Sequence, residues 1–377
     1  KIIEIIMEEI HIAGTGIWYP NDVITNDEIV ISFNKYVDNF NEVNKDSISN
    51  GTLNKLDHSS VEFIEKASGI KTRHVVDKKN ILDVDRMMPS LKHEDESRLS
   101  IHAVAGIEAA KKAMAQAKVT PDDIDAVILG TSHNARYYPA VAIEIQNELG
   151  IDGYAYDMLV GCSSTTFAIN NAFSDIASGL AETILVVNPE ISTPAVNFGK
   201  RDIHFIFGDG CVASIIKKNS TSDKSFKIID RKLMTQFSNN IRSDWSYLAR
   251  TASDHKTSDD LIFNQNGSSV FKEVCPLVAK FVSTQLEKND IKVEEISKFW
   301  LHQANARMIN LIVSKIIGSD DFDTSLAPLP IEKFGNLASA GSMFAFNLNN
   351  DLEPGEKGII CSFGAGYSVC SIIVEKT

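Results

Sequence analysis

Three residues in this sequence have the types and positions needed for nucleophilic chemistry, and the first is a cysteine. Cys162 follows an apolar run that ends at Gly161 and precedes a segment with helical apolar spacing (Phe167, Ile169, Phe173). This pattern places the thiol at a helix N-terminus, where partial positive charge favours the thiolate and predicts a lowered pKa. A structural cysteine in a tight turn is the alternative interpretation.

The other two residues are a histidine and an asparagine. His302 ends an apolar run in FWLHQANARM, beside Asn305, and Asn336 lies in the small-residue turn FGNLASAGS. Polar side chains at strand ends are where the sites of α/β proteins gather. A buried core histidine and an ordinary turn asparagine are the alternatives. Together with Cys162 they form a candidate nucleophilic site, and spacing alone does not separate it from a papain-like Cys/His/Asn hydrolase.

Two glycine-rich loops accompany these residues, FGDG at 207–210 and FGAGY at 363–367. The second has the flexibility to present a backbone N–H to a developing oxyanion, and we interpret the first as structural. Neither has the spacing of a dinucleotide-binding or Walker loop, so the sequence does not predict phosphate binding there.

The elements that must position these residues alternate between β-rich runs and amphipathic helices, which is typical of an α/β fold. Buried strands are expected at 126–130 and 182–187, and helices at 103–117 and 139–149. Insertions or surface helices are expected at 34–60 and 76–100, and a solvated loop with interleaved aromatic residues at 219–260.

A repeat organises the chain. VTPDDIDAVILGTSHN (119–134) resembles KVEEISKFWLHQAN (292–305), and FGDGCVASIIKK (207–218) resembles FGAGYSVCSIIVEK (363–376). Two matched pairs in the same order predict duplication of one α/β unit. We therefore expect one half at 8–218, which carries Cys162 and the insertions, and a second at 219–377, which carries His302 and Asn336.

Composition narrows the class of protein. The net charge of −13 disfavours nucleic-acid and anionic-membrane binding, and no apolar run is long enough to cross a bilayer. The five cysteines are scattered, without zinc or disulfide spacing, which indicates a reducing, cytoplasmic setting. The start is neither a signal nor a transit peptide, and Met7 rather than Lys1 is expected to be the natural first residue.

The motifs GCSS, FGDG, HQANAR, GN-x-x-SAGS and FGAGYS, in this order, resemble the β-ketoacyl-acyl carrier protein synthase III family over nearly the whole chain. The segments RYYPAVAIEIQ and LMTQFSNNIR resemble its β-ketodecanoyl subclass, which prefers medium-chain primers. The resemblance implies a dimeric, five-layered αβαβα thiolase fold built from two duplicated halves. It also implies a decarboxylative Claisen condensation of an acyl-coenzyme A with malonyl-acyl carrier protein, without a metal or a further cofactor.

The resemblance assigns roles to individual residues. Cys162 takes the acyl group, the backbone N–H groups of Cys162 and Ala365 stabilise the oxyanion, and His302 and Asn336 donate hydrogen bonds to the malonyl thioester. Substrate-binding roles are implied for five more residues: Phe63 and Arg201 at the coenzyme A adenine, Tyr138 in the partner subunit's acyl pocket, Arg307 at the carrier protein or the phosphopantetheine phosphate, and Asn305 as a further substrate-binding residue. Phe63 replaces the usual tryptophan, and Ala365 interrupts the usual glycine triplet.

Three other functions use the same residues. A degradative thiolase needs a second catalytic cysteine, for which Cys361 is the candidate. A non-condensing acyltransferase, or a condensing enzyme of polyketide or other specialised metabolism, would keep Cys162 but change the acceptor. Because Asn336 is present beside His302, decarboxylative condensation is the favoured function.

Overall fold

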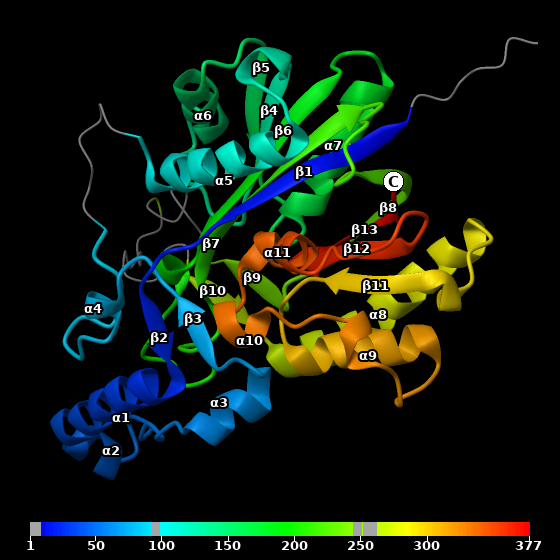
Figure 1. Cartoon of the computed structure of the whole chain (residues 1–377). Coiled ribbons are helices and arrows are strands. Elements are labelled where there is room, and N and C mark those ends of the chain that lie inside the picture. Colours follow the sequence, from blue (N-terminus) through cyan, green and yellow to red (C-terminus); the bar gives the residue numbers. More distant parts are fainter. Residues whose placement is uncertain (1–8, 92–98, 244–250, 252–261) are drawn as a thin grey trace, which may run out of the picture.

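The computed structural model describes residues 9–91, 99–243, 251 and 262–377, and a nine-stranded sheet runs through it in the order β11-β12-β13-β8-β1-β7-β6-β4-β5 (Figure 1). The strands are β1 (Ile10–Trp18), β4 (Ala126–Gly130), β5 (Tyr154–Met158), β6 (Thr183–Ile191), β7 (Asp209–Lys218), β8 (Phe226–Ser238), β11 (Ile296–Leu301), β12 (Lys357–Gly364) and β13 (Gly366–Lys376).

The first half of the sheet, from β1 to β5, is covered on its outer face by α5 (Ile101–Ala117) and α6 (Val141–Leu149). Every residue of β4 is buried, as expected for a continuous apolar strand with helices on both faces. The alanine-rich helix α5 lies very close to β1. A Cβ at Gly14 would lie only 2.6 Å from the carbonyl oxygen of Ala113, so this packing requires glycine.

The second half, from β8 to β11, is covered by α8 (Gly267–Lys288) and α9 (Ala306–Ile317). Its pairing repeats that of the first half. β4 is parallel to β6, which is antiparallel to β7, and β11 is likewise parallel to β12, which is antiparallel to β13. The two halves meet where β1 pairs with β8. This order agrees with the repeated sequence segments, while the boundaries 8–218 and 219–377 stay a prediction.

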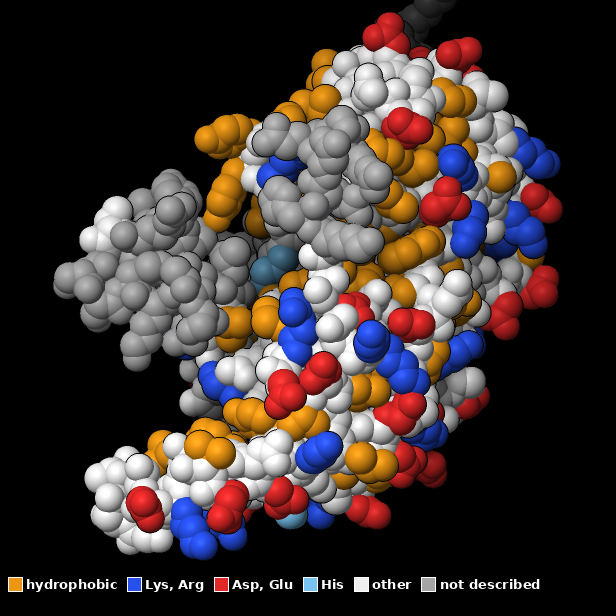
Figure 2. All heavy atoms as spheres, turned by 90° about the vertical axis from the view of Figure 1, so that its left-hand side faces the viewer, with side chains coloured by type: hydrophobic (Ala, Val, Ile, Leu, Met, Phe, Trp, Pro, Cys, Tyr) orange, Lys and Arg blue, Asp and Glu red, His pale blue; other side chains and the backbone are white. Residues whose placement is uncertain are grey.

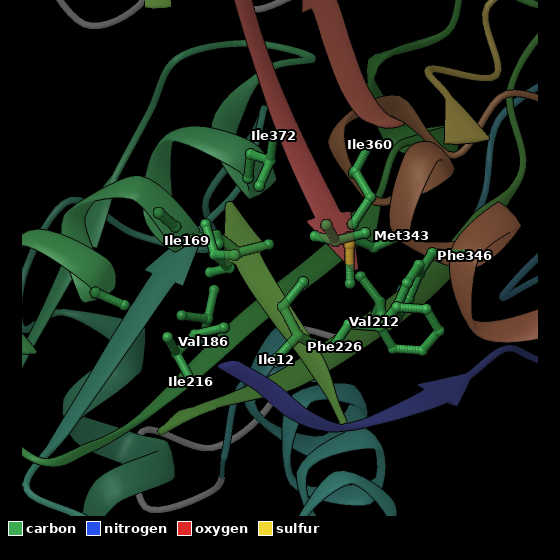
Figure 3. Close-up of a cluster of buried hydrophobic side chains, with 14 of the residues drawn as sticks. Ile12, Ile169, Val186, Val212, Ile216, Phe226, Met343, Phe346, Ile360 and Ile372 are labelled. Atoms are coloured by element: carbon green, nitrogen blue, oxygen red, sulfur yellow. The ribbon is translucent and has the colours of Figure 1, made fainter. Parts of the chain in front are cut away.

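Between the two halves lie α7 (Ser164–Ala177) and α11 (Gly341–Leu348). Figure 3 shows Ile169 of α7 and Met343 of α11 in one cluster with Val186 of the first half and Ile360 of the second. The layers therefore run helix, sheet, helix, sheet, helix, which confirms the five-layered arrangement. Apolar side chains from both faces of the central layer are buried together, and this holds the N-terminal ends of α7 and α11 in place.

The smaller elements are β2 (Val23–Thr25), α1 (Asn26–Val43), α2 (Lys45–Ser49), α3 (Val61–Ser68), β3 (Thr72–His74), α4 (Lys78–Ile81), β9 (Ile241–Ser243), β10 (Phe263–Gln265) and α10 (Ile331–Phe334). Of these, the elements within residues 23–74 form a lobe below the sheet (Figure 1). A separate hydrophobic cluster joins α1, α3 and α10 to the segment 196–207. This cluster brings Phe63 of α3 near the central layer.

The expected elements at 103–117, 126–130, 139–149 and 182–187 are confirmed. The expectation of a solvated loop at 219–260 is wrong for 226–238, which form β8. Its sequence misleads because most of its side chains are only half-buried. The Lys232 ammonium group, for example, lies over the Phe281 ring, 4.4 Å from its centroid, and donates to the Phe281 carbonyl. Trp245 and Tyr247 of that stretch lie outside the described residues. Within the described chain, no helix combines the length and apolarity that a membrane span needs.

Candidate active site

Cys162 lies between β5 and α7, one residue before the N-cap Ser163. The turn is tight, with Ser164 N–H donating to the Gly161 carbonyl at 3.1 Å. Gly161 has φ of 53°, a conformation that strongly favours glycine. The strand-to-turn-to-helix placement predicted for the thiol is therefore observed.

The loop between β12 and β13 approaches Cys162 from the other half. A Cβ at Gly364 would lie 2.6 Å from Cys162 Cβ and 3.2 Å from its sulfur, so a glycine is needed for this approach. Hydrogen bonds from the backbone N–H groups of Ala365 and of Cys162 itself lower the pKa of the thiol. Two backbone donors thus face the reactive sulfur.

Burial nevertheless raises the pKa of the Cys162 thiol to about 12, and the negative charge of Glu190 also raises it. The expectation of a lowered pKa is therefore wrong. Desolvation of the thiolate and repulsion from a nearby carboxylate outweigh the favourable donors at the start of α7. Cys162 carries its proton at neutral pH.

His302 directly follows β11 and is buried, with its backbone N–H donating to the Cys361 carbonyl at 2.8 Å. Its ring packs edge-on against Phe363, with 5.3 Å between centroids. Burial lowers the pKa of His302 to about 4, and a backbone hydrogen bond with Ala338 acts in the opposite direction. The imidazole is neutral at pH 7.

Asn336 follows α10 and is held by its backbone. Its N–H donates to the Ile206 carbonyl at 2.9 Å, and its carbonyl accepts from Gly208 at 3.2 Å. Its side-chain Oδ1 accepts from Ala338 N–H at 2.9 Å, which leaves the Nδ2 group available to a ligand. The FGDG loop therefore has the structural role expected of it, because its residues fix Asn336.

One pocket joins the three residues. Cys162, His302 and Asn336 all line a cavity of about 330 Å³. The rest of its wall is mostly apolar and includes Phe63, Phe205, Phe207, Phe263, Phe271 and Met308. This combination of an apolar wall and a few polar groups is typical of a small-molecule site.

Phe63 and Arg201 are in direct contact, with the guanidinium 3.8 Å from the ring centroid. Arg201 also donates from Nε to the His58 carbonyl at 2.7 Å. An adenine between these two side chains would require Arg201 to move. Their binding roles stay a prediction.

The other predicted binding residues lie in different settings. Asn305 lines the pocket, but it caps α9 by accepting from Arg307 N–H at 2.8 Å and donates to the Ala67 carbonyl. Arg307 is exposed in the first turn of α9. Tyr138 is 85% exposed and its neighbour Tyr137 is 65% exposed, away from the pocket wall.

The sequence interpretation missed a buried polar group behind Cys162. Glu190 of β6 is fully buried, and its Oε1 accepts from Ser132 and Ser339. Burial raises the pKa of this carboxyl to about 7. The available signal was an acidic residue three positions after the apolar run that ends at Val187, in VVNPEIS.

Comparison with known proteins gives two family matches. Residues 156–236 match the family described as 3-oxoacyl-[acyl-carrier-protein (ACP)] synthase III, and residues 286–376 match its C-terminal counterpart. The chain is 44% identical over 348 residues to the β-ketodecanoyl-[acyl-carrier-protein] synthase of Pseudomonas aeruginosa, covering 92% of this chain and 99% of that protein. It is 25% identical over 369 residues to a β-ketoacyl-[acyl-carrier-protein] synthase III of Methylococcus capsulatus, covering 97% and 98% of the two chains.

Solved structures share the fold. The 3-oxoacyl-[acyl-carrier-protein] synthase III of Aquifex aeolicus superposes with a TM-score of 0.74 at 24% identity, covering 97% of this chain and 99% of that one. The priming β-ketosynthase of the R1128 polyketide pathway superposes with a TM-score of 0.77 at 21% identity, covering 98% and 97%.

Proposed function

The chain belongs to the 3-oxoacyl-[acyl-carrier-protein] synthase III family, and we propose that it condenses a medium-chain acyl-coenzyme A with malonyl-acyl carrier protein. The product is a β-ketoacyl-acyl carrier protein, and the reaction is a step of fatty-acid biosynthesis. The observation that carries this proposal is that Cys162, His302 and Asn336 line one largely apolar pocket together.

In the first half-reaction, Cys162 attacks the acyl thioester and keeps the acyl group. Negative charge develops on the former carbonyl oxygen, and the backbone N–H groups of Cys162 and Ala365 stabilise it. Support comes from the hydrogen bonds of these two groups with the sulfur. Such preorganised donors act strongly in a site from which water is excluded.

In the second half-reaction, malonyl-acyl carrier protein loses carbon dioxide and its thioester becomes an enolate. His302 and Asn336 donate hydrogen bonds to the enolate oxygen, and the carbanion then attacks acyl-Cys162. The low pKa of His302 supports this role, because a neutral imidazole donates an N–H without adding a charge. Asn336 is also neutral, and its anchored Oδ1 orients the amide.

The medium-chain primer rests on the identity with the Pseudomonas relative, whose name specifies a β-ketodecanoyl product. The apolar wall of the pocket is compatible with the acyl chain of a thioester. The proposed reaction needs no metal and no additional cofactor, because the coenzyme A thioester is itself the acyl donor and decarboxylation supplies the carbanion.

We further propose that the chain works as a homodimer in the cytoplasm. Large exposed hydrophobic side chains favour a second copy as the partner: Tyr137, Tyr138, Ile143 and Leu159 are all exposed on or beside α6 and β5. Figure 2 shows hydrophobic side chains standing out from one face of the molecule. Exposed Arg307 at the start of α9 is the proposed contact for an acidic carrier protein.

The degradative thiolase alternative is less well supported. Its candidate second cysteine, Cys361, is fully buried in the cluster beneath α8 and α9 and is not part of the pocket wall. Burial raises the pKa of its thiol far above the ordinary value. A catalytic base in this position would have no contact with a substrate.

The proposal is tested by supplying malonyl-acyl carrier protein with acetyl-, octanoyl- or decanoyl-coenzyme A and measuring β-ketoacyl-acyl carrier protein by mass spectrometry. We expect the octanoyl primer to give the most product. Activity with acetyl-coenzyme A alone would keep the mechanism but contradict the medium-chain primer. No product from any primer would contradict condensation from coenzyme A donors.

A further inference from the structure

The proposed first half-reaction needs a group that accepts the proton of the Cys162 thiol. Cys162 has to lose its proton before or during attack, and burial keeps it in the thiol form at neutral pH. His302 does not serve as the acceptor, because its own pKa lies at about 4. Another group near the sulfur must accept the proton if acylation is to be fast.

Glu190 is a fully buried carboxyl group whose charge acts on the Cys162 thiol. One of its oxygens is fully engaged: Oε1 accepts from Ser132 N–H at 2.9 Å, from Ser339 N–H at 3.1 Å and from the Ser339 hydroxyl. These donors come from the end of β4 and from the turn that precedes α11. They fix the carboxyl plane between the two halves of the molecule.

The other oxygen is free. Within the described residues, Glu190 Oε2 is buried without a hydrogen-bond partner, and so is the hydroxyl of Ser132. Leaving such groups unpaired is costly, so two of them at one site indicate a functional purpose. A proton arriving at Glu190 would settle on Oε2, because no donor competes for that oxygen.

Ser132 lies next to both this carboxyl group and the turn that carries the nucleophile. Its N–H donates to Glu190 Oε1 at 2.9 Å, and the carbonyl of the preceding Thr131 accepts from the hydroxyl of Ser164, two residues after Cys162, at 3.0 Å. The Ser132 hydroxyl also favours the ionised forms of both Cys162 and Glu190. A hydroxyl both donates and accepts, so it is able to pass a proton from one side to the other.

We propose that Glu190 is the proton acceptor of the acylation step and that the Ser132 hydroxyl relays the proton to it from Cys162. This inference rests on the proposed function, since it concerns the same nucleophile and the same acyl donor. It adds a proton pathway to the first half-reaction and leaves the roles of His302 and Asn336 unchanged.

As Cys162 Sγ forms its bond with the acyl carbon, its proton passes to Ser132 Oγ, and the hydroxyl proton of Ser132 passes to Glu190 Oε2. The bond between the acyl carbon and the coenzyme A sulfur then breaks. The departing thiolate takes up one proton from the relay, which returns Glu190 to the carboxylate before the malonyl substrate binds.

The surroundings of Glu190 suit this role. The titratable groups that respond to its charge are Cys162 at the start of α7 and Cys211 on β7. Cys211 is fully buried and its thiol pKa is raised well above the ordinary value, so it stays protonated. The pKa of Glu190 at about 7 is matched to neutral pH, as is efficient for a group that accepts and returns a proton.

The test is the rate at which octanoyl-coenzyme A acylates Cys162, followed by quenched intact-mass measurements at a series of pH values. For the wild type we expect the rate to rise with pH through about 7 and then to level off, because only the carboxylate accepts a proton. E190Q keeps the size of the side chain and an oxygen for Ser132 and Ser339. We expect it to acylate about 100-fold more slowly at neutral pH and to lose the levelling.

S132A is the second variant, and it removes the relay hydroxyl while it keeps the carboxyl group and the Ser132 N–H that binds Glu190 Oε1. We expect a loss similar to that of E190Q. S342A is the matched control, because Ser342 is an equally buried serine whose hydroxyl bonds to Ser362 at 2.8 Å. Its acylation should match the wild type. Thermal unfolding of all three variants separates a lost proton pathway from a lost fold.

Acylation of E190Q at the wild-type rate, or faster, would overturn the inference, since the charge of Glu190 would then only suppress the thiolate. An unchanged pH profile in S132A would overturn the relay. In both cases the condensing function stands if the wild type forms its adduct. A wild type that forms no adduct would instead contradict the proposed function itself.

Discussion

The two halves of this molecule repeat the same strand order but carry different chemistry where their central helices begin. At α7, Cys162 is enclosed beside a buried carboxyl group, whose charge raises the pKa of its thiol. At α11, the preceding turn holds Asn336 and contacts His302, and both are neutral at pH 7. In the proposed mechanism, one scaffold used twice separates covalent acyl capture in the first half from stabilisation of a developing enolate in the second.

The largest expected effect tests this separation directly. H302A and N336A should each lower condensation by about 100- to 1,000-fold, because each removes a donor to the developing enolate. Both variants should still form the octanoyl adduct on Cys162. Condensation rates and adduct yields measured on the same preparations check this, and loss of the adduct in N336A would show that the two halves do not divide the work.

A second prediction concerns the charge state in the second half. The pKa of His302 falls from its ordinary 6.5 to about 4 on folding, so the unfolded chain takes up this proton at a higher pH than the folded one. Neutral His302 therefore contributes its full share of the free energy of unfolding above about pH 6.5, and this contribution is lost as the pH falls towards 4. This term amounts to about 3 kcal/mol.

Urea unfolding of the wild type and of H302N across this pH range measures the term. Between about pH 6.5 and 4, we expect the free energy of unfolding of H302N to fall by about 3 kcal/mol less than that of the wild type. Other buried histidines contribute equally to both proteins. Parallel curves for the two proteins would contradict a buried neutral imidazole in the folded state.

A third prediction addresses the contact between the halves. G364A adds a Cβ that would meet Cys162 Cβ at 2.6 Å. We expect overpacking to cost about 1–3 kcal/mol of stability, and displacement of the nucleophile to slow acylation. G355A is a suitable control, because nothing lies within 4 Å of a Cβ there, although its positive φ also carries some strain. Unchanged acylation in G364A would show that the β12–β13 loop does not set the position of the sulfur.

The smallest effect is expected from C361A. The side chain is buried but small, so we expect a stability loss of about 1 kcal/mol. Adduct formation and condensation should be unchanged, because Cys361 does not line the pocket. Loss of all condensation in a folded C361A protein would revive the thiolase alternative and give the second half a nucleophile of its own.

The sequence predicted those parts of the fold where local pattern and burial agree. The apolar run of β4 and the periodic helix α5 were predictable, because continuous or helical apolar spacing leaves few other structures open. β8 was not predictable, because its half-buried polar residues resemble those of a loop until the neighbouring strand β13 is known.

The candidate site shows the same contrast between features that local sequence predicts and features that depend on contacts between distant segments. Residue type and position beside predicted strands singled out Cys162, His302 and Asn336 as candidates, and the structure brings them to one pocket, while their catalytic roles stay a prediction. The raised pKa of Cys162 and the carboxyl group behind it could not be predicted, because both depend on which side chains from distant segments enclose the sulfur. Ser132, Glu190 and Ser339 come from three separate parts of the chain, and only the folded sheet brings them together.

The most direct test of the central claim is the intact mass of the protein after incubation with octanoyl-coenzyme A, with C162S as the control. The account predicts one octanoyl adduct on the wild type and none on C162S. An adduct of equal yield on C162S, or an adduct mapped to any other residue, would contradict Cys162 as the nucleophile and with it the proposed division between the two halves.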